Sequence, residues 1–489
     1  MRKIPFDNSY ARLPEVFFAL VQPEKAPDPA WIRVNTELAD FLELDRDWIL
    51  SEEGLAMFSG KALPKEAKPI AMAYAGHQFG GWVPRLGDGR ALLLGEVIAQ
   101  DGMRHDIQLK GAGKTPFSRA GDGKSALGPV LREYIVSEAI AALGVPTTRA
   151  LAAVTTGETV HRDSIQPGAV LTRVAQSHVR IGTFQYFSAC GDEKAVKTLA
   201  DYVIDRHYPE VKQHANPYKA LLKEIVERQA VLIAQWMSFG FIHGVMNTDN
   251  MQVVGETIDY GPCAFMDEYH PQKVFSSIDR QGRYSWMNQP TIAQWNLARL
   301  AETLLFLLAE DQDQAVKEAE GALGAFNDKF SERFSNVFSQ KLGLQWSGEE
   351  HRDFIENTLS VMAESEVDFT LFFRHLTCVA GGESEKVLRS LFNDPTDCDK
   401  WLKTWRIYLT KDNWDQERRV AVMRRKNPIF IPRNHRIEDA IQAAQKGDYK
   451  PFNLLVDILK NPFTEQPENA ELEKAPTPEE VVHHTFCGT

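Results

Sequence analysis

The spacing of apolar residues changes once along this chain, and that change limits the fold more than any other feature of the sequence. Between residues 70 and 109, short apolar runs alternate with glycine-rich turns, as in GWVPRLGDGRALLLGEV, which is typical of antiparallel strands. After about Ala195, stretches such as PYKALLKEIVERQAVLIAQW repeat their apolar residues with a helical period, and this continues to about Lys460. We therefore predict an α+β protein with two lobes, a small β-rich lobe and a large helical one.

The limits of these lobes follow from where the pattern changes. Residues 1–69 are predicted to form an N-terminal extension, residues 70–165 the small lobe, and residues 166–460 the helical lobe with the catalytic loop. The final segment, 461–489, is rich in proline and glutamate, so we predict a flexible C-terminal tail.

The amino-acid balance argues against a nucleic-acid or membrane partner. The formal net charge is −12, so no broad basic surface is expected that could hold a polyanion. The one membrane-like stretch, AVLIAQWMSFGFIHGVM at 230–246, is interrupted by glutamine, histidine and glycine. We predict that it is a buried helix running into a loop. The amino terminus MRKIPFDNSYARL has no apolar run of the kind found in secretory signals, so no signal peptide is expected.

The cysteines indicate a reducing environment. There are five, an odd number, and no two of them form a CxxC pair, so neither a zinc site nor a disulfide framework is predicted. This distribution fits a cytoplasmic protein. They are Cys190, Cys263, Cys378, Cys398 and Cys487.

The segment QLKGAGKTPFSRAGDGKS, residues 108–125, contains two copies of Gly-Lys-Thr/Ser, the ending of a phosphate-binding P-loop. A P-loop also needs a glycine five residues before that ending, because its backbone wraps the phosphates. Those two positions hold Gln108 and Ser118. Both copies therefore fail as P-loops.

Lys110 fits phosphate binding better than either of those lysines. It ends the apolar strand DIQLK, follows a glycine turn at Gly87 and Gly89, and precedes a helix that carries Glu133. In the small lobe of a protein kinase, a strand lysine contacts the nucleotide phosphates and is steadied by a helix carboxylate. A surface lysine whose stem packs on apolar neighbours would show the same local pattern.

A second motif lies in the helical half. Kinases place a catalytic Asp and a metal-binding Asn at HxDxxxxN, followed by an Asp-Phe-Gly triplet. Here His243 and Asn250 keep that spacing and Asp259-Tyr260-Gly261 follows, but the Asp position holds Val245, which cannot accept a proton. Asp249 is the nearest carboxylate and could be a displaced base, with Asn250 and Asp259 as ligands of Mg²⁺ or Mn²⁺. A loop-capping aspartate is the alternative.

The remaining phosphate contacts should be cationic or formed by backbone N–H groups. Candidates are Arg90 beside the glycine turn, and Arg173 and Arg180 in LTRVAQSHVRIGTF. Asp122-Gly123 could contact a nucleotide through a carboxylate and an N–H group. For each arginine a surface ion pair is the alternative, and for Asp122-Gly123 a simple turn.

These blocks together resemble the selenoprotein O family, SelO, whose bacterial members are called YdiU. The matching blocks run in order over about 200 residues, and the length and amino-terminal FDNSYARL agree as well. The blocks are YAGHQFGGWVPRLGDGRALLLGE, QLKGAGKTPFSRAGDGKSALGPVLREY, LTRVAQSHVRIGTF, HGVMNTDN and IDYGPCAFMD.

The resemblance implies a protein-kinase-like fold that binds ATP in a flipped orientation and transfers AMP to Ser, Thr or Tyr hydroxyls of proteins. Bacterial relatives are also associated with UMP transfer from UTP, with Mn²⁺. It implies that Asp249 accepts the proton, that Asn250 and Asp259 bind the metal, and that Lys110, paired with Glu133, contacts phosphate. The nucleotide-binding positions it implies are Gly87, Gly89, Arg90, Lys110, Asp122, Gly123, Arg173, Arg180 and Asp259.

The carboxyl-terminal TFCGT matches the family's C-terminal cysteine, here Cys487. Some members join that residue to a cysteine downstream of the DYG-type triplet. In this chain the downstream segment carries Ser276 and Ser277 and no cysteine, with Cys263 the only nearby alternative. A regulatory disulfide at Cys487 therefore lacks its usual partner.

Two other functions compete with nucleotidyl transfer. A phosphotransferase of the aminoglycoside-kinase type shares the HGxxxxxN pattern, but Val245 argues against it. A kinase-like scaffold without catalytic activity would have no need of two metal ligands, so the presence of Asn250 and Asp259 argues against it.

Overall fold

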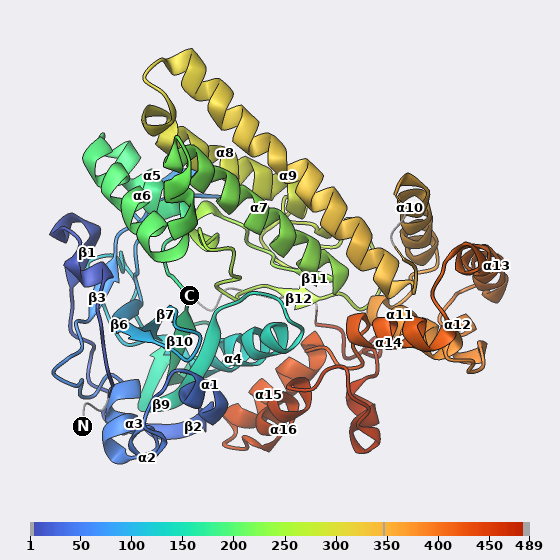
Figure 1. Ribbon diagram of the computed structural model, residues 1–489. Coiled ribbons are helices and arrows are strands. Elements are labelled where there is room, and N and C mark those ends of the chain that lie inside the picture. Colours follow the sequence, from blue (N-terminus) through green and yellow to red (C-terminus); the bar gives the residue numbers. More distant parts are fainter. Residues whose placement is uncertain (1–3, 346–347, 483–489) are drawn as a thin grey trace.

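The chain folds into an antiparallel β-sheet region followed by a largely helical region (Figure 1), which confirms the predicted α+β class. The computed structural model describes residues 4–345 and 348–482. The eight-stranded sheet has the order β1-β3-β6-β7-β10-β9-β2, with β8 beside β10. Its strands are β1 (Phe18–Leu20), β2 (Ala30–Val34), β3 (Ile70–Met72), β6 (Ala91–Ile98), β7 (Arg104–Lys110), β8 (Ser125–Ala126), β9 (Arg149–His161) and β10 (Ile165–Ala175).

The sheet extends across both predicted boundaries, at residues 69 and 165. β1 and β2 come from the predicted N-terminal extension and pair with β3 and β9. β10 pairs with β7 and β9, and so carries the sheet to Ala175. Both β1 and β2 are too short for a period of two to distinguish them from loop.

The sheet has two buried faces because side chains alternate along each strand. On one face Leu171 shares a core with Leu131 of helix α4 (Leu127–Ala142). On the other face Leu109 and Val170 pack with residues of three short helices near the amino terminus. Lys110 is adjacent to Leu109, so it lies on the α4 face. The three short helices are α1 (Thr36–Phe41), α2 (Arg46–Ile49) and α3 (Glu52–Phe58).

The helical region is built around three long helices, α7, α8 and α9, which pack against one another (Figure 1). The apolar stretch at 230–246 forms the end of α7, the strand β11 (Phe241–Ile242) and the loop after it. Among the described helices, none combines the length and apolar character that a membrane span requires. The helices of this region are α5 (Ile181–Ala189), α6 (Glu193–His207), α7 (Pro217–Ser238), α8 (Gln289–Leu308), α9 (Gln312–Lys341), α10 (Glu349–Glu364), α11 (Phe369–Ala380), α12 (Lys386–Arg389), α13 (Pro395–Lys411), α14 (Gln416–Lys426), α15 (Asn434–Gln445) and α16 (Lys450–Leu459).

The last two helices return to the sheet region and cover α4 (Figure 1). Arg132 of α4 donates to Asn434 Oδ1 and to Glu438 Oε1 of α15, both at 2.7 Å. Tyr134 of α4 meets the ring of Phe452 of α16 edge to face, with centroids 5.6 Å apart. α4 is therefore buried between the sheet and the C-terminal helices.

The segment predicted as a flexible tail, 461–489, is described up to residue 482. Glu465 pairs with Arg374 of α11, and the Glu473 carbonyl accepts a hydrogen bond from Arg433 Nε at 3.1 Å. These contacts hold the described part of the segment against the helical region.

Lys341, at the end of α9, is buried and has no carboxylate partner among the residues that the structure describes. Its side chain is 2% exposed, and its Nζ donates to the Lys426 carbonyl at 3.2 Å and lies 4.3 Å from the centroid of the Phe373 ring. Burial lowers the pKa of Lys341 well below the ordinary value of 10.5, with a further contribution from the charge of Lys426. A single hydrogen bond does not replace the hydration of an ammonium group.

Replacing Lys341 with methionine is therefore expected to stabilise the protein near pH 7, by about 1–3 kcal/mol. Because the unfolded chain binds a proton that the folded protein does not, the stability contributed by Lys341 rises as the pH increases from its lowered pKa toward 10.5. In urea unfolding experiments, the difference in free energy of unfolding between Lys341→Met and the wild type should be smaller near pH 9.5 than near pH 7. A Lys341→Met protein that is less stable than the wild type, by the same free energy of unfolding at both pH values, would contradict the expectation.

Candidate active site

Lys110, at the end of β7, meets two carboxylates that come from distant parts of the chain. Its Nζ lies 2.5 Å from Glu133 Oε2 on α4 and 2.8 Å from Asp259 Oδ1. The pairing with Glu133 confirms the relation predicted from the sequence. Asp259 follows β11 and the catalytic loop in the chain, so this contact joins the sheet region to the helical region.

Arg173, from β10, is a second cation at the same point. It is 1% exposed, and its Nη1 lies 2.7 Å from Asp259 Oδ1 and 3.2 Å from Glu133 Oε1. Its Nε and Nη2 donate to Gln108 Oε1 at 3.1 and 2.6 Å. Gln108 stands opposite Arg173 in the ladder between β7 and β10, and two residues before Lys110 on the same face. The period of the strands therefore places these side chains together.

Arg180, the residue before α5, connects Asp259 to the catalytic loop. Its Nη1 donates to Asp259 Oδ2 at 2.8 Å and to the backbone carbonyl of Asp249 at 2.7 Å. The guanidinium group also lies over the Tyr74 ring, 4.6 Å from its centroid, and 3.9 Å from Asp88 Oδ1. One side chain thus fixes the position of two predicted functional residues.

The cations and carboxylates of this cluster balance each other. Burial opposes ionisation of Asp259, but the charges of Lys110, Arg173 and Arg180 outweigh it and hold its pKa well below the usual range. Burial raises the pKa of Asp88 to about 6 against the charge of Arg180. A polyphosphate that entered here would replace carboxylate oxygens as the partner of three cations, which is what a nucleotide site requires.

His243 opens the catalytic loop and has a structural role. Its Nε2 lies 2.8 Å from the Ile258 carbonyl, and its Nδ1 accepts from the Val245 N–H at 3.3 Å. These partners require a proton on Nε2 and a lone pair on Nδ1, which is the neutral ring. Burial also lowers the pKa of His243. His243 therefore holds the loop and is not a base.

Asp249 is the one carboxylate of this loop, and one of its oxygens is free. Oδ2 accepts a hydrogen bond from Gln78 Nε2 at 3.1 Å, whereas the buried Oδ1 has no hydrogen-bond partner in the described parts of the chain. Burial raises the pKa of Asp249 to about 6, against the Gln78 hydrogen bond and the charge of Arg180. An oriented carboxylate with an unused oxygen can accept a proton from a hydroxyl.

A short hairpin, β4 (Gly76–Gln78) and β5 (Gly81–Val83), lies on the catalytic loop. The His77 N–H donates to Thr248 Oγ1 at 2.7 Å, and the Phe79 N–H donates to Asn247 Oδ1 at 3.1 Å. Gly76 is required here because a Cβ atom would lie 2.6 Å from Asp249 Oδ1. The absence of a side chain leaves room for that oxygen beside the hairpin.

Asn250 and Asp259 suit a hard divalent cation that also binds phosphate. Asn250 Nδ2 donates to the Val245 carbonyl at 3.0 Å, which leaves its Oδ1 as a possible ligand. Among the described residues no three His, Cys, Asp or Glu side chains cluster in a way that could hold a metal by themselves. Two oxygen donors are compatible with Mg²⁺ or Mn²⁺, which take their other ligands from phosphates and water.

Gly87 and Gly89 flank Asp88 in the turn before β6. A Cβ at Gly87, whose φ is 71°, would lie 2.3 Å from the Phe117 ring, and one at Gly89 would lie 2.9 Å from the Phe117 carbonyl. The glycines therefore allow the loop that carries Phe117 to pack on this turn. Their predicted contact with a nucleotide stays a prediction, as does that of Arg90, whose carbonyl accepts from the Gly111 N–H at 2.7 Å.

Asp122 and Gly123 lie in the same loop, between β7 and β8. Both Asp122 oxygens accept from Arg162, at 2.8 and 3.0 Å, and not from the cations of the cluster. A Cβ at Gly123 would lie 2.1 Å from the Gly113 carbonyl. In this structure the two residues stabilise the loop, and their nucleotide contact remains a prediction.

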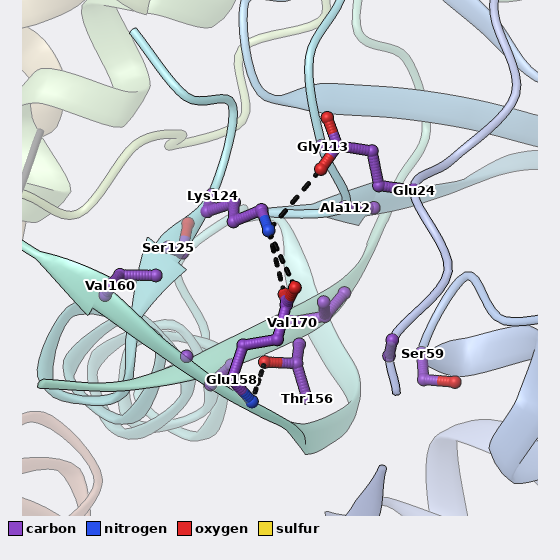
Figure 2. A pocket seen from close by; sticks show the side chains of 14 residues that line it. Glu24, Ser59, Ala112, Gly113, Lys124, Ser125, Thr156, Glu158, Val160 and Val170 are labelled. Carbon is purple, nitrogen blue, oxygen red and sulfur yellow. Dashed lines mark hydrogen bonds and ion pairs between the residues drawn. The ribbon is translucent and has the colours of Figure 1, made fainter. Parts of the chain in front are cut away.

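A small pocket beside this loop contains Lys124, one of the two lysines of the rejected P-loop (Figure 2). Lys124 Nζ lies 2.9 Å from both oxygens of Glu158 and 3.5 Å from Glu24 Oε2, as Figure 2 shows. Val170, which packs on the face opposite α4, also lines the pocket. Lys124 is thus neutralised away from the Asp259 cluster, which agrees with rejecting a P-loop.

Cysteine pairing finds no support among the described residues. No disulfide bond joins Cys190, Cys263, Cys378 or Cys398 within the described residues, and Cys263 is buried. Cys487 lies outside the described residues.

Four residues of the site were not predicted: Gln78, Tyr74, Asp88 and Gln108. Two of them had a usable signal, because Gln108 shares the strand face of Lys110 and Asp88 lies between two singled-out glycines. Gln78 and Asp249 are 171 residues apart, and nothing in one sequence indicates their contact.

Comparison with known proteins finds similarity over nearly the whole chain. Residues 1–460 match the family described as protein adenylyltransferase SelO. The chain is 57% identical to the protein nucleotidyltransferase YdiU of Rhodopseudomonas palustris strain BisB5, over 99% of both chains. It is 54% identical to the protein of the same name from Rhizobium etli, over 99% of this chain and 97% of that one, and 55% identical to the one from Bradyrhizobium sp. strain ORS 278, over 99% of both. The chain therefore belongs to the SelO family of protein adenylyltransferases.

Proposed function

We propose that this protein transfers AMP from ATP, or UMP from UTP, to Ser, Thr or Tyr hydroxyls of other proteins and releases pyrophosphate. Family membership implies a kinase-like fold, in which the sheet region is the small lobe and the helical region the large one. The observation that carries the proposal is the free Oδ1 of Asp249, which Arg180 links to the cation cluster at Asp259.

In the proposed reaction, the hydroxyl oxygen attacks the α-phosphorus and its proton passes to Asp249 Oδ1. The new bond joins that oxygen to phosphorus, and the bond from phosphorus to the bridging oxygen of pyrophosphate breaks. Lys110, Arg173 and Arg180 stabilise negative charge on the phosphates, and Glu133 holds Lys110 in place. Gln78 keeps the second oxygen of Asp249 occupied, so that only one orientation of the carboxylate is populated.

Mg²⁺ or Mn²⁺, bound through Asn250 Oδ1 and Asp259, would supply further positive charge to the phosphates. Asn250 is already oriented by its hydrogen bond to the Val245 carbonyl. The other role of the protein's own residues is to orient the substrate hydroxyl toward Asp249.

Labelled nucleotides distinguish the three candidate functions. The protein is incubated with ATP labelled at the α or at the γ phosphate, with Mg²⁺ or Mn²⁺ and a mixture of proteins. Label from the α position alone is the expected result, and the same assay with α-labelled UTP compares the two donors. Label from the γ position alone would identify a kinase, and no label from either position would favour a scaffold. Mass spectrometry of the labelled peptides identifies the modified side chain.

A further inference from the structure

The outer side of the β4–β5 hairpin carries an aromatic and cationic surface beside the catalytic loop. The His77 ring lies between Trp82, at 4.9 Å, and Trp295 of α8, at 5.1 Å between centroids. Two guanidinium groups lie over Trp295, those of Arg283 at 4.9 Å and Arg299 at 5.1 Å. We call these five residues the hairpin face. Trp82 is 41% exposed.

The inner side of the same hairpin contacts the proposed base. Gln78 binds the Asp249 carboxylate, and Gly76 lies against its free oxygen. At the tip of the hairpin, a Cβ on Gly80 would lie 3.5 Å from the Arg283 guanidinium carbon. The hairpin face therefore borders the place where an acceptor hydroxyl must enter.

Arg283 differs from the other arginines of the site in having no carboxylate partner. Within residues 4–345 and 348–482, no Asp or Glu oxygen comes within ion-pair distance of its guanidinium group, and its Nε is buried without a hydrogen-bond partner. Arg299, in contrast, lies 2.6 Å from Glu302. Asp279 is the nearest acid in the chain, but its oxygens accept from the backbone N–H groups of Arg283 and Tyr284. Arg283 therefore retains an unneutralised charge.

We propose that the hairpin face docks an extended segment of the protein substrate, and that Arg283 selects an acidic residue near the hydroxyl that is modified. The inference rests on the proposed function and specifies its substrate class. Charge complementarity supports it, because an unpaired cation on a chain with a net charge of −12 attracts an acidic segment to one place. Trp82 and Trp295 offer apolar area to the rest of that segment.

The hairpin also sets the distance between the two recognition points. Gln78, which contacts Asp249, and Gly80, beside Arg283, belong to the turn end of the same hairpin, where Phe79 and Gly80 have φ values of 51° and 82°. The acidic residue is therefore expected within a few positions of the modified hydroxyl.

The test uses the full-length protein and synthetic peptides that each contain one serine. The peptides differ only in carrying Glu, Ala or Lys at each of the three positions on either side of that serine. Transfer of α-labelled nucleotide is measured for the wild type, for Arg283→Gln and Arg283→Glu, and for the control Arg280→Gln. Arg280 is an exposed arginine of the same segment. The KM for ATP is measured with each variant.

The wild type and Arg280→Gln should prefer a Glu peptide to its Lys counterpart about three- to tenfold in kcat/KM, through KM for the peptide. Arg283→Gln should lose that preference and Arg283→Glu should reverse it, with the KM for ATP unchanged. Equal use of Glu and Lys peptides by the wild type, or a preference that survives in Arg283→Glu, would overturn this inference alone. A raised KM for ATP in the Arg283 variants would also overturn it, because it would assign Arg283 to the nucleotide. No labelling of any peptide or protein would overturn the proposed function and this inference together.

Discussion

Asp259→Asn is expected to reduce nucleotidyl transfer by about two to three orders of magnitude. Asp259 is the common partner of three cations, Lys110, Arg173 and Arg180, and it is also a proposed metal ligand. An amide can accept hydrogen bonds, but it neither neutralises three charges nor binds a hard cation well. Transfer of α-labelled nucleotide, measured over a range of Mn²⁺ concentrations, gives the effect.

The same substitution is expected to destabilise the protein by about 3 kcal/mol, because it removes the carboxylate that both buried arginines, Arg173 and Arg180, share. ATP should restore much of the melting temperature, since its phosphates take over as the partner of those cations. Asp368→Asn is the matched control, because Asp368 pairs with the buried Arg433 at 2.8 Å and lies away from the cation cluster. That variant should lose a similar amount of stability, keep its specific activity and gain no extra stabilisation from ATP. A fully active Asp259→Asn protein would refute the assignment.

Asp249→Asn is expected to slow transfer by about two to four orders of magnitude while nucleotide binding stays close to that of the wild type. The substitution keeps the shape of the side chain and a group able to accept the Gln78 hydrogen bond, but it removes the proton acceptor. The backbone carbonyl that Arg180 contacts is also kept. Single-turnover measurements with α-labelled ATP, together with calorimetric titration of nucleotide, separate chemistry from binding.

Asp192→Asn is the control for the view that Asp249 only caps a loop. Asp192 caps α6 by accepting a hydrogen bond from the Ala195 N–H at 2.9 Å. Because asparagine caps a helix about as well as aspartate, the substitution should change stability by less than about 0.5 kcal/mol and leave turnover unchanged. If Asp249→Asn behaves in the same way, the base must be another group.

The ion pair between Lys110 and Glu133 could be predicted from the sequence, but the pairing of Asp259 with three cations could not. Lys110 and Glu133 lie on a strand and the helix that follows it, and Asp259 stands at a fixed offset from Asn250. The free oxygen of Asp249 could not be predicted, because it depends on a hairpin more than 150 residues earlier in the chain. For the same reason the pairing of Asp122 with Arg162 was not foreseen. Contacts of this kind depend on how the whole chain packs and not on local preference.

In the fold, too, local patterns could be predicted from the sequence and long-range contacts could not. Alternating apolar runs predicted the central strands and helical periodicity predicted the long helices, since both patterns arise within one element. The strands β1 and β2 and the covering of α4 by α15 and α16 depend on partners supplied by remote segments. A helix pattern predicts that α15 has an apolar face, but not which surface that face covers.

The covering of α4 by α15 and α16 also affects the order in which the protein can fold during translation. Glu133 is made early, but the outer side of its helix is closed by residues such as Asn434, which bonds Arg132 from 302 positions further along the chain. A nascent chain that has already produced Lys110, Asp249 and Asp259 still has one side of α4 open to water. The packing around the helix that carries Glu133 is therefore completed only after the whole central part of the helical region has been made.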